Sequence, residues 1–275
     1  MLASTSYAQQ DARAESQAQG PLFLVGGGKR DAAALRVFMG WSVEFALSSA
    51  ERVERSVRVL IVPWASSEGG EACAAARADF LAAAESMEIP AGISLLVECS
   101  PAALQSEASI AEAKKGFESA DGIFFGGGDQ VRLLETLDSA KLTNLVRSRN
   151  RKGLPVGGTS AGLAVLSEVM LTGEGDFTVI DPDSVETRKG LDLAHGAIFD
   201  QHFLKRQRLN RLLSALQGNS KMVGVGVDED VAAGLTPDGK LTVLSEGIVT
   251  VVRPIALDPR RFNLRLLSKG DWIKL

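Results

Sequence analysis

Residues 154–162 read LPVGGTSAG and join an apolar stretch to a run of small residues. The apolar stretch, 154–157, predicts a buried strand, and the run 161–169 predicts a helix. Between them Gly158, Ser160 and Gly162 form a G-x-S-x-G pattern, whose serine occupies a tight turn with its hydroxyl above the sheet edge. The glycines let the chain turn and let the strand and helix pack closely. The pattern predicts a hydrolase, although a serine before a helix is also a common N-cap.

Short apolar strands alternate with longer helical stretches before this junction. The expected strands are 21–25, 57–62, 92–97 and 121–125. The expected helices are 36–47, 72–87, 110–119, 131–137 and 142–149. Continuous apolar strands in this alternation predict a parallel sheet with helices on both faces. Ligands of such sheets bind beyond the carboxyl ends of the strands, so we expect the glycine turns 26–28, 126–128 and 157–162 to line one crevice.

The pattern becomes mixed after about Leu171. Hairpin-like pieces occur at 223–227, 232–235 and 241–252, and residues 236–239 (TPDG) predict a turn between the last two. No internal repeat is present. The sequence therefore predicts an α/β fold for residues 21–275: a single domain with a mostly parallel central sheet, flanking helices and a few antiparallel C-terminal strands.

The N-terminal segment, residues 1–20, is rich in Ala, Gln and Ser and has no hydrophobic periodicity. We expect it to be disordered or peripheral. It lacks the apolar core of a signal peptide, but residues 4–10 (STSYAQQ) resemble the region around a signal-peptidase cut. This resemblance favours an exported protein, periplasmic or secreted, over a cytoplasmic one.

The composition excludes several classes of protein. Of 275 residues, 45% are hydrophobic and 23% are charged, as in ordinary globular proteins. The net charge of −4 argues against a nucleic-acid binder, which usually carries a basic face. No apolar run approaches the roughly 20 residues of a membrane span. Neither nucleic acid nor membrane is therefore an expected partner.

Metal and nucleotide sites are also not expected. Cys73 and Cys99 lack metal-ligand spacing, and His195 and His202 are the only histidines. Both cysteines are interpreted as buried apolar residues, with a disulfide as the alternative. The triplet 26–28 does not continue into G-x-G-x-x-G, which disfavours a dinucleotide site.

His202 is the candidate base for Ser160. It opens a stretch, 203–213, that we expect to be helical, with His202 and Arg206 on one face. A run of charges usually marks a solvated helix face, but residues 203–216 contain no Asp or Glu. We therefore predict an unpaired cationic cluster that binds an anionic substrate group. Its members are Lys205, Arg206, Arg208 and Arg211.

The acid that would orient His202 follows the apolar strand 223–227. This strand delivers Asp228, Glu229 and Asp230 at its end, and the spacing alone does not choose between them. The resulting order, Ser…His…acid, differs from the Ser…acid…His order of α/β-hydrolases. A lipase-like enzyme is therefore disfavoured unless the acid precedes His202.

Several segments together resemble the cyanophycinase family, serine peptidases related to aspartyl dipeptidase. The segments are 126–130 (GGGDQ), 158–162 (GTSAG), 200–203 (DQHF) with the three arginines, 226–230 (GVDED) and 61–67 (IVPWASS). The similarity runs from about Leu22 to Val252, with the motifs in the order of the family. It implies a fold like that of class I glutamine amidotransferases.

The resemblance also implies roles. Ser160 would be the nucleophile, His202 the general base and then acid, and Glu229 the residue that orients His202. Gly127 and the backbone N–H of Ala161 would form the oxyanion hole. The implied substrate-binding residues are Gln130, Asp200, Gln201, Arg206, Arg208 and Arg211. No metal or organic cofactor is implied, and a homodimer is an expectation from the family alone.

The main hypothesis is a serine exopeptidase that cleaves at β-linked aspartyl residues, releasing β-Asp-Arg dipeptides from cyanophycin. The alternatives are an α-aspartyl or isoaspartyl dipeptidase acting on short peptides, and a non-catalytic binding protein on the same fold. Two positions depart from the family. Leu163 stands where alanine is common, and Lys29-Arg30 form a basic loop that we expect near the leaving-side pocket, where it would repel arginine.

Overall fold

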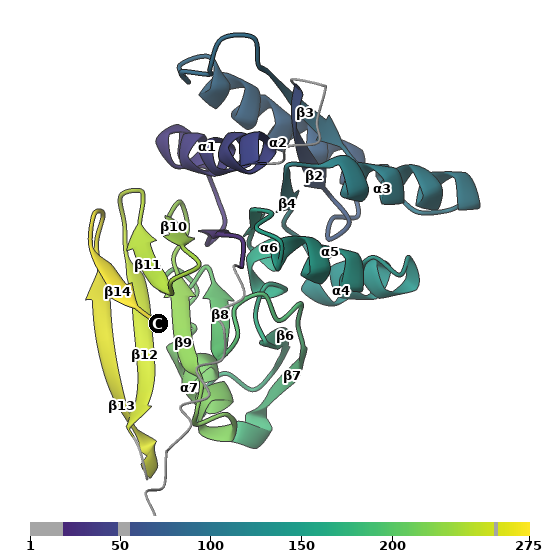
Figure 1. Cartoon of the computed structure of the whole chain (residues 1–275). Helices are drawn as coiled ribbons and strands as arrows, with labels where there is room; N and C mark the ends of the chain where they lie inside the picture. Colours follow the sequence, from purple (N-terminus) through teal and green to yellow (C-terminus); the bar gives the residue numbers. More distant parts are fainter. Residues whose placement is uncertain (1–18, 49–55, 256–257) are drawn as a thin grey trace, which may run out of the picture.

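The computed structural model describes residues 19–48, 56–255 and 258–275 (Figure 1). Its largest sheet contains strands from both ends of the chain. In chain order these are β1 (Leu22–Val25), β2 (Ser56–Val62), β3 (Ser94–Cys99), β4 (Gly122–Phe125), β5 (Val156–Thr159), β10 (Ala232–Leu235), β11 (Lys240–Val243) and β14 (Trp272–Lys274). Their order across the sheet is β14-β11-β10-β1-β5-β4-β2-β3. β1 to β5 pair in parallel, and β10, β11 and β14 are antiparallel additions, which confirms the predicted fold class.

Helices cover both faces of the parallel part. Those before β5 are α1 (Ala32–Ser48), α2 (Gly69–Ala84), α3 (Glu107–Ser119), α4 (Gln130–Ser139) and α5 (Thr143–Asn150). Alternate residues of β1 belong to different clusters: Phe23 and Val25 pack with α1 and α2, whereas Leu22 and Leu24 pack with α3 to α5. Burial on both faces explains the continuous apolar strands, since a buried aromatic or aliphatic side chain contributes about 1.5–3 kcal/mol.

A second sheet has the order β13-β12-β9-β8. Its strands are β8 (Ala197–Gln201), β9 (Val223–Val227), β12 (Val249–Ile255) and β13 (Asp258–Leu267). α7 (Leu209–Gly218) packs on one of its faces. The expected single piece 241–252 is wrong: β11 pairs with β10 in the first sheet, whereas β12 pairs with β9 in the second. The turn at 236–239 is confirmed, because the Gly239 N–H donates to the Thr236 carbonyl at 2.8 Å.

A two-stranded sheet projects beside this second sheet (Figure 1). It consists of β6 (Val169–Gly175) and β7 (Val185–Lys189), with a short 3-10 helix at Pro182–Ser184 between them. We refer to this unit as the β6–β7 hairpin.

The helix after Ser160 is shorter than predicted. α6 covers Ala161–Ala164, so the expectation of a helix to residue 169 is wrong. The segment 190–194 donates hydrogen bonds to the carbonyls of Val165, Leu166 and Ser167, which a longer helix would have used internally. Close packing at the junction depends on its glycines: a Cβ at Gly158 would lie 2.1 Å from the Gly162 carbonyl oxygen.

Most of the N-terminal segment, residues 1–18 with the stretch STSYAQQ, lies outside the described residues. Gly20 is described, is buried, and donates its N–H to the Asn150 carbonyl at 2.7 Å. Within the described ranges, no helix combines the length and the apolar character needed to cross a membrane.

Cys73 and Cys99 form a disulfide between α2 and β3, with their Cα atoms 6.0 Å apart. The interpretation of both as buried apolar thiols is therefore wrong, and the alternative holds. Cys73 is 2% exposed, but Cys99 is exposed at the end of β3. The sequence did not reveal the pairing, because only the packing of α2 on the sheet brings residues 26 positions apart together.

Reduction of this disulfide is expected to destabilise the fold. Closing a 26-residue loop lowers the entropy of the unfolded chain enough to contribute roughly 3 kcal/mol. For a protein of this size we expect Tm to fall by roughly 6–10 °C in dithiothreitol. The C73A/C99A double variant is the control, since reductant should leave its Tm unchanged. An equal Tm with and without reductant in the wild type would contradict the assignment.

Candidate active site

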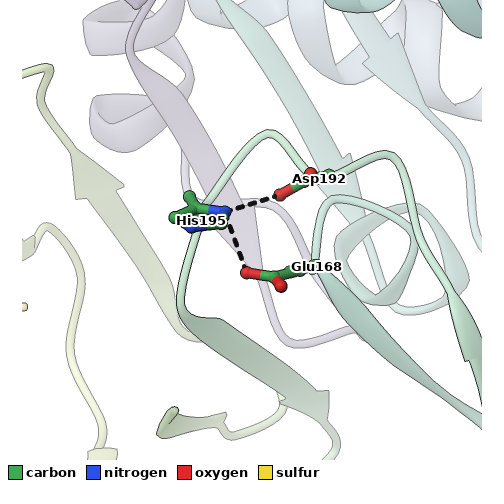
Figure 2. Close-up of side chains that lie close together, drawn as sticks. All are labelled: Glu168, Asp192 and His195. Atoms are coloured by element: carbon green, nitrogen blue, oxygen red, sulfur yellow. Dashed lines mark hydrogen bonds and ion pairs between the residues drawn. The ribbon is translucent and has the colours of Figure 1, made fainter. Parts of the chain in front are cut away.

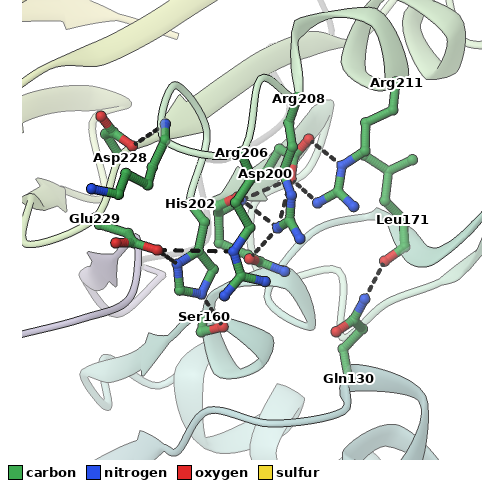
Figure 3. Close-up of polar contacts among 12 residues, drawn as sticks. Gln130, Ser160, Leu171, Asp200, His202, Arg206, Arg208, Arg211, Asp228 and Glu229 are labelled. Atoms are coloured by element: carbon green, nitrogen blue, oxygen red, sulfur yellow. Dashed lines mark hydrogen bonds and ion pairs between the residues drawn. The ribbon is translucent and has the colours of Figure 1, made fainter. Parts of the chain in front are cut away.

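Ser160, His202 and Glu229 meet where strands of the two larger sheets end (Figure 3). Ser160 follows β5, His202 follows β8 and Glu229 lies just beyond β9. Ser160 Oγ is 2.8 Å from His202 Nε2, and His202 Nδ1 is 2.7 Å from Glu229 Oε1. The hydroxyl, the imidazole and the carboxylate thus form one continuous hydrogen-bonded chain.

Two of these residues have unusual backbone conformations. Ser160 has a φ of 52° and His202 a φ of 49°, in the left-handed region that non-glycine residues rarely adopt. Such strain persists only where the surroundings enforce it, and it occurs most often at functional sites. The Ser160 N–H donates to the Val25 carbonyl at 3.0 Å and the His202 N–H to the Gly26 carbonyl at 2.8 Å. The end of β1 therefore holds both strained residues.

Only one member of the acidic triplet contacts the imidazole. Asp228 Oδ1 accepts a hydrogen bond from the Lys205 N–H at 2.9 Å, and Asp230 accepts one from the Lys29 N–H. Glu229 is left to reach His202. Each of the three carboxylates thus has its own partner, and the choice depends on how residues 228–230 turn after β9.

The environment of His202 favours its neutral form. Burial is the largest effect that lowers the pKa of His202 below its ordinary value of 6.5, and the positive charges of Arg206 and Arg208 lower it further. The hydrogen bond to Glu229 raises the pKa but offsets only part of this. At neutral pH the imidazole is therefore available as a proton acceptor.

The predicted oxyanion groups lie beside the serine. A Cβ built on Gly127 would lie 3.3 Å from Ser160 Cβ, and Ala161 is the first residue of α6. Within the described ranges, the N–H groups of Gly127 and Ala161 donate to no protein acceptor. The N–H at the first position of a helix is free in general, and it favours negative charge. These two groups are geometrically available to an oxyanion.

The three glycine turns do converge on one crevice, as predicted. A Cβ on Gly27 would lie 2.2 Å from His202 Cε1, Gly127 lies beside Ser160, and Gly158 belongs to the elbow itself. The departure at Leu163 is a matter of packing, because this side chain is fully buried in the main core cluster.

The arginine segment is not a helix over its whole length. α7 begins at Leu209, and residues 203–208 form turns, so the expected helix from 203 is wrong. The left-handed conformations of His202 and Gln207 prevent regular helical hydrogen bonding before residue 208. The Arg206 N–H still donates to the His202 carbonyl at 3.0 Å, which keeps these two residues together.

The expectation that all the arginines lack internal partners is also wrong. Arg211 Nε donates to Asp200 Oδ2 at 2.8 Å, and its Nη2 bonds the other carboxylate oxygen (Figure 3). Both side chains are at most 2% exposed. The search for acidic partners at helical spacing missed Asp200 because it comes from β8, outside the helix. The Asp200–Arg211 pair is therefore buried, whereas the side chains of Arg206 and Arg208 are more exposed.

Arg208 is a partly buried cation of the site. Its side chain is 15% exposed, and its Nη1 donates to the carbonyl of Gln201 at 2.8 Å and to the Gln201 side chain. Burial and the neighbouring charge of Arg211 lower the pKa of Arg208 to about 10. It remains charged at neutral pH, so an anionic ligand would relieve an unfavourable concentration of positive charge.

A cavity of about 550 Å³ opens at Ser160 and His202. Gln130, Gln201 and all three arginines line it, whereas Asp200, the other residue expected to bind substrate, does not. The amide nitrogen of Gln130 already has protein partners: Nε2 donates to the carbonyl of Leu171 at 3.1 Å and to that of Thr172. A neighbouring cavity of about 710 Å³ shares Asp129 and Val131 with the first.

The sequence analysis missed one side of this cavity. The β6–β7 hairpin contributes Thr172, Gly173, Glu174, Glu186 and Arg188 to the lining. The available signal was the stretch 171–176 (LTGEGD), in which two glycines flank a glutamate. Such spacing inside a strand indicates a bulge.

The basic loop does not reach this cavity. Neither Lys29 nor Arg30 lines it, and Arg30 Nη2 forms an ion pair with Asp79 Oδ2 at 2.8 Å. The expectation that these residues would repel an arginine in the leaving-side pocket is therefore wrong. The loop follows β1, and the charge of its Arg30 is paired with that of Asp79 on α2.

The other histidine belongs to a separate cluster (Figure 2). His195 Nδ1 is 3.0 Å from Glu168 Oε2 and 3.3 Å from Asp192 Oδ1. In the described part of the chain, this is the group of side chains that offers three metal-ligand atoms within 4.8 Å of one another. His195 precedes β8 and His202 follows it, so the length of the strand separates this cluster from Ser160.

The fold and this geometry define a class, that of hydrolases with a Ser–His–acid site beyond the carboxyl ends of a parallel sheet. Residues 49–241 match the model of peptidase family S51, and the chain belongs to this family.

Individual relatives are consistent with the family. The chain is 38% identical over 186 residues to a cyanophycinase from Nostoc sp., a match that covers 62% of each chain. It is 39% identical over 169 residues to a cyanophycinase from Synechococcus elongatus, covering 56% of this chain and 52% of that protein. The chain thus spans about half to three fifths of the curated relatives it matches. A solved peptidase from an acI-B1 Actinobacterium superposes with a TM-score of 0.65 at 19% identity, covering 94% of this chain and 98% of that one, and so shares the fold.

Proposed function

We propose that this protein is a serine exopeptidase that hydrolyses cyanophycin to β-Asp-Arg dipeptides. The observation that carries the proposal is the cavity in which Ser160, hydrogen-bonded to His202, shares the lining with the cationic Arg206 and Arg208. Cyanophycinase relatives in the same family support the substrate. β-Aspartyl-arginine carries a free carboxylate, which these two cations can bind.

The proposed reaction uses the chain's own groups throughout. Ser160 Oγ attacks the scissile carbonyl carbon while His202 Nε2 takes the hydroxyl proton, and Glu229 stabilises the resulting imidazolium at Nδ1. The N–H groups of Gly127 and Ala161 bind the oxyanion of the tetrahedral intermediate. His202 then gives its proton to the departing amine, which breaks the peptide bond and leaves an acyl-enzyme. Water attacks the carbonyl carbon of this ester while His202 Nε2 accepts a proton from it. The tetrahedral intermediate then collapses, which breaks the bond to Ser160 Oγ; His202 returns its proton to this oxygen, and the carboxylate product leaves.

The remaining site residues take positioning roles in this proposal. Gln201 holds Arg208, Asp200 holds Arg211, and Gln130 fixes the β6–β7 hairpin against α4. The second cavity, which shares Asp129 and Val131 with the first, would give a polymer room beyond a single unit.

The test is hydrolysis of two substrates side by side: insoluble cyanophycin, and short aspartyl dipeptides in α and β linkage. Release of β-Asp-Arg from the polymer would support the proposal. Activity on the dipeptides alone would replace it with the alternative of an α-aspartyl or isoaspartyl dipeptidase. Binding of the polymer without hydrolysis would favour the non-catalytic alternative.

The pH dependence of the reaction should follow His202. Because the neutral imidazole is the base and its pKa is lowered, kcat/KM should stay high as pH falls and decline only below pH 6.5. The variant R206Q removes a positive charge, so the pKa of His202 should rise and the acid limb should move to higher pH. K205Q removes a neighbouring charge outside the cavity lining and should leave the limb in place. A wild-type acid limb centred above 6.5 would contradict the role of His202.

Export remains a proposal as well. It is supported by the Cys73–Cys99 disulfide, since disulfides persist mainly in oxidising compartments. N-terminal mass analysis of the native protein tests it, and a longer, unprocessed form in the cytoplasm would exclude it. The homodimer is still an expectation from the family, which light scattering of the purified protein can test.

A further inference from the structure

The cavity beside Ser160 has acidic as well as basic walls. Its acidic residues are Asp129, Glu174 and Glu186. Asp129 caps α4, accepting hydrogen bonds from the N–H groups of Val131 and Arg132. A ligand that fills this cavity therefore meets both signs of charge.

Within the part of the chain that the structure describes, Glu174 is the acidic residue of this lining whose carboxylate has no protein partner. The Glu186 carboxylate lies 3.4 Å from Arg188 Nε, and Arg188 also bonds Glu135 at 2.9 Å. Among the described residues, the carboxylate of Glu174 has no hydrogen-bond or ion-pair partner, and the residue is exposed. It is thus free to bind a cationic group of a ligand.

Glu174 lies in a β-bulge, which sets the direction of its side chain. β6 and β7 pair Leu171 with Thr187 and then Gly175 with Val185, so residues 172–174 bulge opposite the single residue Glu186. Gly173 and Gly175, with φ of 104° and 132°, allow this bulge. Bulges redirect side chains and are frequent beside active sites.

Other contacts hold the bulge against the site. Gln130 Nε2, at the start of α4, donates to the carbonyls of Leu171 and Thr172. Thr172 Oγ1 donates to the Glu186 carbonyl at 3.2 Å and accepts from the Glu174 N–H at 3.3 Å. The segment that carries Glu174 is therefore tied both to α4 and to β7, the opposing strand.

We propose that Glu174 binds the guanidinium of the substrate's β-aspartyl-arginine unit while Arg206 and Arg208 bind its carboxylate. This inference rests on the proposed function and makes the cavity selective for a unit that carries both charges. A carboxylate and a guanidinium form two parallel charge-assisted hydrogen bonds, which a neutral group of the same shape cannot reproduce.

Citrulline provides the matched probe, because it replaces the charged guanidinium by a neutral ureido group of nearly the same shape. We would measure kcat and KM on short soluble chains of β-aspartyl-arginine units and on the same chains with citrulline. The wild type should prefer arginine by about tenfold in kcat/KM, mainly through KM. E174Q should lose this preference while its rate on the citrulline chain stays as in the wild type.

D176N is the control, since Asp176 lies two residues further along the hairpin and outside the cavity lining. It removes the same charge and should keep the preference for arginine. If E174Q also keeps it, or if the wild type cleaves both chains equally, the assignment of Glu174 is wrong and the proposed peptidase activity stands. If the wild type cleaves neither chain, the proposed function fails and the Glu174 assignment fails with it.

Discussion

Replacing Ser160 by alanine is expected to reduce the proposed hydrolysis of cyanophycin by about 10⁵-fold, to the limit of detection. The substitution removes the hydroxyl that forms the acyl-enzyme in the proposed mechanism. It also removes the proton donor that lies 2.8 Å from His202 Nε2. In triad peptidases the loss of the nucleophile costs as much as the loss of the whole triad. Release of β-Asp-Arg, followed by chromatography, measures the effect.

Binding should survive this substitution. Arg206 and Arg208 are unchanged in S160A. Alanine meets the same steric restriction as serine at the φ of 52°, so the turn should be retained. Co-sedimentation with the polymer should therefore match the wild type. S148A, which removes a serine hydroxyl on α5, is the control and should be fully active. Turnover by S160A above about a tenth of the wild-type rate would exclude Ser160 as nucleophile.

Replacing Glu229 by glutamine is expected to lower kcat by about 10³- to 10⁴-fold. Glutamine keeps the size of the side chain, but it cannot stabilise the imidazolium that forms when His202 takes the serine proton. It also no longer raises the pKa of His202, so the imidazole becomes still more completely neutral. The loss therefore cannot come from protonation of His202 in the resting enzyme.

D228N is the matched control for this experiment. Asp228 accepts a hydrogen bond from the Lys205 N–H, which an asparagine oxygen can also accept, so kcat should change by no more than about threefold. Thermal unfolding should show that E229Q folds, because Glu229 is 29% exposed. A large loss in D228N with little change in E229Q would reverse the assignment of the acid.

Much of the fold could be predicted because its signals are local. The strands 22–25, 122–125 and 156–159 are continuous apolar or small-residue runs, and each is followed by a glycine turn. Burial on both faces imposes that pattern on parallel strands. The helices were placed to within a few residues by their periodicity. The errors fall where segments remote in the sequence decide the structure. The helix α6, for example, ends at Ala164, and the carbonyls of the next three residues, 165–167, accept hydrogen bonds from the segment 190–194.

The candidate site was predictable to a different extent for each residue. Ser160 lies in a local motif, and His202 was one of two histidines. Glu229 could not be separated from its neighbours by spacing, and the resemblance to a family indicated it. The Asp200–Arg211 pair and the Glu174 bulge were not visible, because each depends on a contact between elements that are remote in the sequence or on a register shift between strands.

The sequence alone determined the α/β class, the serine elbow and the supply of cations near His202, because these follow from short-range patterns of residue type. Only the tertiary structure decided which carboxylate reaches the imidazole, which arginine is neutralised and that Cys73 and Cys99 are joined. It also decided which glutamate of the cavity lining has no partner among the described residues. The physical reason is that charge pairing, burial and pKa depend on distances of a few ångströms between groups. Those distances are set by how strands and helices pack, and the sequence does not display them.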